Sequence, residues 1–141
     1  MTGNIKFPAS GVYLAPPDLQ PLRDAAKQAG LTWFELNLAG IEHKREFLKV
    51  CAKGLRFPRW FGGNWDALAA CLKDLYADCV VYCRNSGQFA EAAPDDYATA
   101  LEIFQDATTY WRERGSTFVA LVDAEPEGVS LARFPAPTKG N

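Results

Sequence analysis

The segment Phe57–Leu72, FPRWFGGNWDALAACL, contains the residues best suited to chemistry at a surface. Three large aromatic residues, Trp60, Phe61 and Trp65, surround the pair Gly62-Gly63. A glycine pair allows backbone angles that other residues avoid, so the sequence predicts a tight turn here. The turn would hold several rings close to one another and close to the segment that follows.

The residues after this turn indicate the start of a helix. Asn64 is a favourable N-cap, because its side chain can accept a hydrogen bond from an unpaired amide of the first turn. Asp66 then falls in that first turn, where the positive end of the helix dipole favours an anion. The segment therefore presents aromatic rings and one fixed carboxylate, which indicates a binding surface and not a catalytic centre.

The chain lacks the patterns of common catalytic and metal sites. It contains no phosphate-binding glycine loop and no arrangement of a catalytic triad. His43 is the only histidine, and the four cysteines have no zinc-type spacing: they are Cys51, Cys71, Cys79 and Cys83. We expect all four to be reduced and buried, and we expect neither a metal nor a cofactor. The protein is predicted not to be an enzyme.

Charge is segregated along the chain, although the net charge is only −2. Between Ile41 and Trp60 there are six basic residues and two acidic ones, whereas eight acidic and two basic residues lie between Asp66 and Asp106. Such asymmetry can steer association with a charged partner. Two ordinary solvated helix faces would give the same counts.

Length and composition indicate one folded domain. The chain has 141 residues, of which 48% are hydrophobic. No apolar run is long enough to span a bilayer, so no membrane association is expected. The N-terminal sequence MTGNIKFPAS does not resemble a secretory signal, so the cytoplasm is the expected location.

Hydrophobic periodicity predicts alternating strands and helices. We expect strands at 11–14, 31–38, 79–83 and 117–122, and helices at 18–29, 43–55, 65–76 and from 95 or 96 to 114. The first helix would be capped by Asp18, and the last by Asp95 or Asp96. This order predicts a small α/β fold with a parallel sheet of about three strands, and a possible fourth N-terminal strand, flanked by helices.

The same pattern suggests three parts of the chain. Residues 1–30 would form an N-terminal extension, a short strand and a helix, packed on the domain. Residues 31–123 would form the domain itself. Residues 124–141 are rich in proline and glycine and are predicted to form a surface tail.

The element order and the sequence WFGGNWDALAACL together resemble the barstar family, small intracellular inhibitors of barnase-type microbial ribonucleases. The resemblance covers about residues 31–123. Its motif residues are Trp60-Phe61, Gly62, Asn64, Asp66-Ala67-Leu68 and Cys71-Leu72, with Phe104-Gln105-Asp106 matching in a later helix.

This resemblance implies a mode of action and a set of partner-binding residues. In the family, the turn and its helix plug the ribonuclease active site with carboxylates that imitate substrate phosphates. Carried over by position, Asp66 matches one family acid, and Asp106 falls where the family has a glutamate. The aromatic residues Trp60, Phe61 and Trp65 fall within the same surface. The implied partner is a basic protein, a ribonuclease or toxin.

Three positions depart from the family pattern. Ala70 stands where the family has its strongest acid, one helical turn after Asp66. Ala69 replaces a tryptophan, and Lys73 replaces a small neutral residue. Asp74, a further turn along, could replace part of the missing charge for a different partner. We therefore expect weak binding of a barnase-type enzyme and a preference for another cognate.

Two other functions remain open from the residues alone. The basic segment Lys44–Arg59, next to Trp60 and Phe61, could pair phosphate neutralisation with base stacking in an RNA-binding module. A scaffold role in a larger assembly is the other alternative. The sequence does not indicate an oligomeric state.

Overall fold

The computed structural model describes residues 9–59 and 61–134. Over these residues the chain forms four strands and five helices. The elements follow in the order β1 (Gly11–Leu14), α1 (Gln20–Gln28), β2 (Thr32–Asn37), α2 (Lys44–Gly54), α3 (Trp65–Lys73), β3 (Cys79–Arg84), α4 (Gly87–Ala92), α5 (Pro94–Glu113) and β4 (Phe118–Val122).

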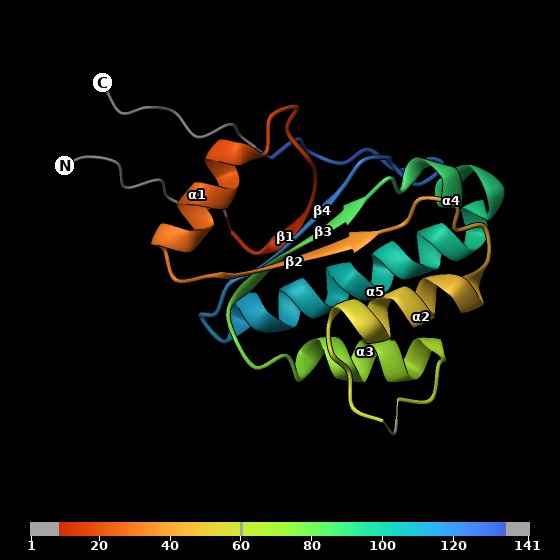
Figure 1. Ribbon diagram of the computed structural model, residues 1–141, viewed down its shortest axis with the longest axis horizontal. Helices are drawn as coiled ribbons and strands as arrows, with labels where there is room; N and C mark the ends of the chain where they lie inside the picture. Colours follow the sequence, from red (N-terminus) through yellow and green to blue (C-terminus); the bar gives the residue numbers. More distant parts are fainter. Residues whose placement is uncertain (1–8, 60, 135–141) are drawn as a thin grey trace.

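The four strands form one fully parallel sheet in the order β1-β4-β3-β2. The parallel arrangement predicted from the sequence is confirmed, and the possible N-terminal strand is its fourth member. From β2 to β4 the chain moves across the sheet in one direction, with α2, α3 and α5 on one side (Figure 1). The connection from β1 to β2 crosses the sheet in the opposite direction, and its helix α1 lies on the opposite side of the sheet. Because direction and side both change, all crossovers have the same hand.

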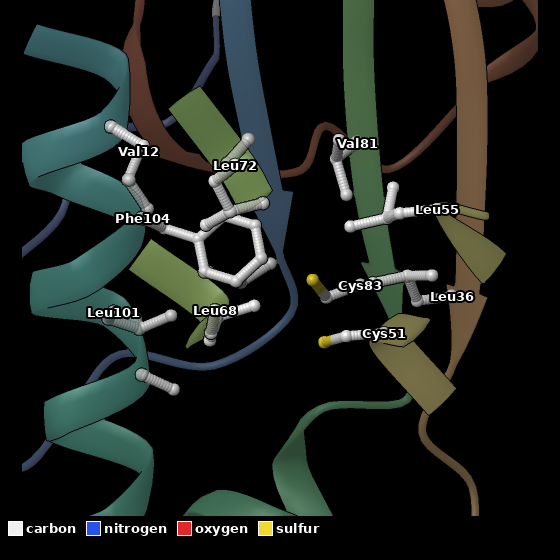
Figure 2. Close-up of a cluster of buried hydrophobic side chains, with 14 of the residues drawn as sticks. Val12, Leu36, Cys51, Leu55, Leu68, Leu72, Val81, Cys83, Leu101 and Phe104 are labelled. Atoms are coloured by element: carbon white, nitrogen blue, oxygen red, sulfur yellow. The ribbon is translucent and has the colours of Figure 1, made fainter. Parts of the chain in front are cut away.

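The larger core lies between the sheet and the layer of α2, α3 and α5 (Figure 2). Alternate residues of β3, namely Cys79, Val81 and Cys83, point into it. Val80 and Tyr82 point to the other side, where they pack with Leu22 and Ala26 of α1. Because both faces of β3 are covered, the apolar sequence of this strand is uninterrupted.

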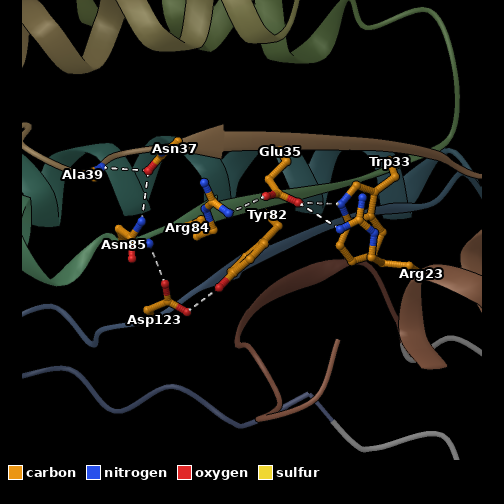
Figure 3. Close-up of polar contacts among 9 residues, drawn as sticks. All are labelled: Arg23, Trp33, Glu35, Asn37, Ala39, Tyr82, Arg84, Asn85 and Asp123. Carbon is orange, nitrogen blue, oxygen red and sulfur yellow. Dashed lines mark hydrogen bonds and ion pairs between the residues drawn. The ribbon is translucent and has the colours of Figure 1, made fainter. Parts of the chain in front are cut away.

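Charged residues on the α1 side of the sheet join the helix to the strands (Figure 3). Glu35 of β2 forms ion pairs with Arg23 of α1 at 3.3 Å and with Arg84 of β3 at 3.4 Å. Asp123, just after β4, accepts hydrogen bonds from the Tyr82 hydroxyl at 2.9 Å and from the Asn85 amide at 2.6 Å. These contacts are partly exposed, so each ion pair adds about 0–1 kcal/mol to stability.

Some helix ends differ from the sequence prediction. α3 ends at Lys73 and not near Tyr76, whose side chain is 69% exposed, because the chain must leave the helix to enter β3 at Cys79. α5 begins at Pro94, which fits the first turn of a helix, and Asp95 and Asp96 lie inside that turn instead of capping it. No side chain caps α1, although Asp18 accepts a hydrogen bond from the Gln20 amide at 3.1 Å.

Most of the described residues after β4 are exposed, but the segment is held against the edge of the sheet at Phe134. Phe134 is only 2% exposed, and its ring contacts that of Tyr13 edge-on at 5.3 Å. Its amide donates to the Leu14 carbonyl at 2.8 Å, and the Leu14 amide donates to the Ala132 carbonyl at 2.9 Å. The reason is that β1 is an edge strand, whose outer backbone groups need partners that this segment supplies.

Candidate partner-binding surface

The start of α3 is fixed by the turn before it. Gly63 has φ of 67°, a conformation that glycine adopts without strain. Asn64 is extended, and its side-chain oxygen accepts a hydrogen bond from the Ala67 amide at 2.7 Å. The predicted N-cap is therefore confirmed. It holds the first turn of the helix, and with it the backbone of Asp66, in a defined position.

Asp66 is exposed at this end of α3, and Ala70 is exposed one turn later. Within the described residues the Asp66 carboxylate has no ion pair, so its charge is available to a partner. The positive end of the helix dipole supports that charge. Ala69 beside it is half-buried, and Gly62 before the cap is exposed.

The aromatic residues of the motif are divided between the core and the surface. Trp65 is half-buried: its ring lies 6.2 Å from Phe47, and the Lys44 ammonium lies 5.0 Å from the ring centre. Phe61 is half-buried against Phe57, with ring centres 5.0 Å apart. Trp60, which the sequence places in the same surface, lies outside the described residues.

α5 packs beside α3 and supplies the second acid. The indole of Trp111 donates a hydrogen bond to the Leu72 carbonyl at 3.0 Å, and the Tyr110 ring lies 5.5 Å from the Lys73 ammonium. The two helices run in the same direction (Figure 1). Asp106 is exposed one turn before Tyr110, so we infer that it lies about level with Ala69 and Ala70. Each of the two helices thus presents one exposed acidic residue of the candidate surface, Asp66 on α3 and Asp106 on α5.

Asp74 does not join this group. It is the C-cap residue of α3, and it lines a shallow pocket with Leu55, Arg56 and Cys71. Lys73 turns the other way, toward Tyr110 of α5. Asp74 and Asp106 are therefore on different sides of the exposed ridge of α3.

The sequence did not predict a cluster of cations at the C-terminal end of α3. The Tyr110 ring contacts Lys73 and also the Arg114 guanidinium, which lies 3.6 Å from the ring centre. The spacing of Tyr110 and Arg114, four residues apart in one helix, could have indicated their contact. The approach of Lys73 depends on how α3 packs on α5, which no local pattern encodes.

The described residues offer no metal site, because nowhere do three or more His, Cys, Asp or Glu side chains converge. The four cysteines are buried and unbonded, as Figure 2 shows for Cys51 and Cys83. Burial raises the pKa of all four thiols, to about 12 for Cys79 and Cys83, so none is an activated nucleophile. In the part of the chain that the structure describes, no helix has the length and apolarity to cross a membrane.

The fold is a four-stranded parallel α/β sheet, with a capped helix that presents Asp66 and a neighbouring helix that presents Asp106. A model of the Barstar (barnase inhibitor) family matches residues 31–123, and the chain belongs to this family. The match begins just before β2 and ends just after β4, so it includes the whole candidate surface. Comparison with individual curated proteins finds no match.

Proposed function

We propose that this protein inhibits a microbial ribonuclease or toxin by covering its basic active site with the start of α3 and the exposed side of α5. We call this the α3 surface: Gly62, Asn64, Trp65, Asp66, Ala69, Ala70 and Asp106, with Trp60 and Phe61 from the preceding turn. The observation that carries the proposal is the exposed Asp66 carboxylate on a capped first turn, in a chain of the Barstar family.

The physical basis is charge mimicry. A ribonuclease active site must bind the phosphates of RNA, so it presents cations, and a fixed carboxylate can occupy a phosphate position. Because the Asn64 cap holds the helix start in place, little conformational entropy is lost when Asp66 binds. Complementary charge raises the association rate and makes that rate depend on salt.

The residues beside Asp66 set which enzyme is preferred. Ala70 leaves the centre of the surface without a second charge, and Lys73 adds a cation at its edge. If a barnase-type enzyme bound here, one cation of its active site would be buried opposite Ala70 without an acidic partner. Burying an unpaired charge costs free energy and weakens binding. We propose that the cognate enzyme has fewer cations, or bulkier apolar groups, at the position that faces Ala70. Like other intracellular inhibitors, the protein would act in the cytoplasm, where such an enzyme is made.

The test captures the partner and measures its activity. Immobilised wild-type protein is exposed to extract from the source cells, and the eluate is assayed for RNA cleavage with and without added inhibitor. Asp66→Ala is compared with Asp24→Ala, which removes one exposed carboxylate from α1 on the opposite side of the sheet. We expect a ribonuclease that wild type and Asp24→Ala capture and inhibit, and that Asp66→Ala fails to retain.

The proposal is wrong if wild type captures no RNA-cleaving activity. It is also wrong if Asp66→Ala captures and inhibits the enzyme as well as Asp24→Ala does. Circular dichroism of the two variants, with equal melting temperatures, shows that the comparison concerns binding and not folding.

A further inference from the structure

The outer face of α2 carries a row of cations that the α3 surface does not use. Arg45, Lys49 and Lys53 recur every four residues and are all exposed, and Arg56 follows just after the helix. At 1.5 Å per residue the helical part of the row is about 12 Å long. The core side of the same helix, with Phe47, faces the opposite way. We call these four residues the α2 row.

In the described part of the chain no member of the α2 row forms an ion pair, since the ion pairs found there join Glu35 to Arg23 and Arg84. Of the acids near the row, Glu46 accepts a hydrogen bond from the Glu42 amide at 3.3 Å, Glu42 accepts one from Gln88 at 3.1 Å, and Asp74 lines a pocket with Arg56. The row therefore keeps its positive charge in a protein whose net charge is −2.

Arg56 occupies its place at a conformational cost. Its φ is 56°, in the left-handed region where a helix end normally has glycine. A non-glycine residue held in this region is an outlier that can mark a functional site. Here the retained side chain extends the row by one charge beyond the end of α2.

A hollow lies beside the row, between α2 and the turn that leads to α3. It has a volume of about 470 Å³ and is lined by Arg45, Leu48, Lys49, Ala52, Phe61, Gly62 and Gly63. Phe61, which is half-buried with its ring packed against Phe57, is one of the residues that line the hollow. The two glycines leave it open, because they carry no side chains that could fill it.

We propose that the α2 row and this hollow bind single-stranded RNA. Phosphates would lie along the row, and one base would stack on Phe61. Regularly spaced cations on one straight helix match a repeating phosphate chain, and a ring within the same hollow suits a flat base. A partner held by the cations alone would not require the ring. The site shares Phe61 and Gly62 with the α3 surface, but its cations lie on and just after α2 and it requires neither Asp66 nor Asp106, so the two functions can be tested separately.

The test is fluorescence anisotropy with a short labelled oligouridine at several salt concentrations. With four phosphates neutralised, log K should fall against log[salt] with a slope of about −3, so affinity falls about fiftyfold between about 50 and about 200 mM NaCl. The double variant Lys49→Gln, Lys53→Gln should make this slope less steep by about 1.4. The control Lys27→Gln, an exposed lysine of α1 on the other side of the sheet, should leave the slope unchanged.

A second variant tests the ring. Phe61→Leu should weaken oligouridine binding about fivefold or more without changing the salt slope, because it removes stacking and no charge. Equal slopes for the double variant and wild type would overturn the proposal. The proposal would also be overturned if polyglutamate or heparin bound as tightly as oligouridine and Phe61→Leu had no effect on oligouridine binding. That result would assign the row to acidic proteins or to polyanions in general.

Discussion

Gly54 is a point of close packing between α2 and the sheet. A β-carbon at this position would collide with the side chain of Leu36 in β2, which is only 1% exposed, so that side chain or the backbone would have to shift. The absence of a side chain therefore sets how near the end of α2 lies to β2. Because α2 ends there, Gly54 also affects where the following turn begins.

We expect Gly54→Ala to lower the free energy of unfolding by about 1–3 kcal/mol, since overpacking forces side chains or backbone to shift. Urea denaturation followed by circular dichroism measures the change. Gly87→Ala is the matched control: no atom lies within 4 Å of the added carbon, and the residue is helical. It should be neutral or stabilising by up to about 1 kcal/mol. Equal effects of the two substitutions would contradict the close contact of Gly54 with Leu36.

At the residue scale, the sequence predicted those features that depend only on residues near in the chain. The Asn64 cap and the position of Asp66 in the first turn follow from residue type and spacing, and both are confirmed. The separation of Asp74 from Asp106 was not predictable, because it depends on how α3 is rotated against α5. The strained backbone of Arg56 gave no sequence signal, since arginine does not indicate the left-handed region.

At the scale of elements, strands were easier to predict than the contacts of their edges. The apolar segments of β3 and β4 identify buried strands directly. The position of β1 beside β4, and the return of the chain to Phe134 along β1, depend on pairings between residues more than 100 positions apart. Composition suggested a surface tail because proline and glycine are frequent there, but it did not indicate that the segment returns to β1 at Phe134.

β3 also makes the stability of the protein depend on pH. Burial, aided by Asp78 for Cys79 and by Asp123 for Cys83, raises the pKa of each thiol to about 12. In the unfolded chain a thiol ionises near about pH 8.5, so above that pH the unfolded state binds fewer protons than the folded one. Stability conferred by these groups is complete below about pH 8.5 and is lost as the pH rises toward about 12.

We expect the free energy of unfolding to fall by about 1.4 kcal/mol per pH unit for each of these thiols within that window. Denaturation curves of wild type and Cys79→Ala between about pH 9 and about pH 11 test this. The variant is less stable at neutral pH because it leaves a cavity, so the slope and not the absolute value is compared. A slope as steep in Cys79→Ala as in wild type would show that Cys79 does not titrate in this way.

At the scale of the whole molecule, the charge segregation in the sequence becomes a division between neighbouring helices. The cations of the α2 row lie on α2 and just after its end, whereas Asp66 and Asp106 lie on α3 and α5. The basic enzyme proposed as the partner would be attracted to the acids and repelled by the row, and so would be oriented before contact. Charge counts along the chain predicted that acidic and basic residues are segregated. Which faces of the molecule carry them depends on how the helices pack.

The most direct test of the α3 surface is to restore the acid that this chain lacks. Ala70→Asp, the control Ala29→Asp at the C-cap of α1 and wild type are titrated against a barnase-type ribonuclease by calorimetry, with inhibition of RNA cleavage as a second readout. Both alanines are exposed, so the two variants add the same charge on opposite sides of the sheet. We predict weak or undetectable binding by wild type and Ala29→Asp, and binding at least tenfold tighter by Ala70→Asp, which corresponds to about 1.4 kcal/mol or more. Equal affinities for Ala70→Asp and Ala29→Asp would contradict the account, because α3 would then not dock in the active site of such an enzyme.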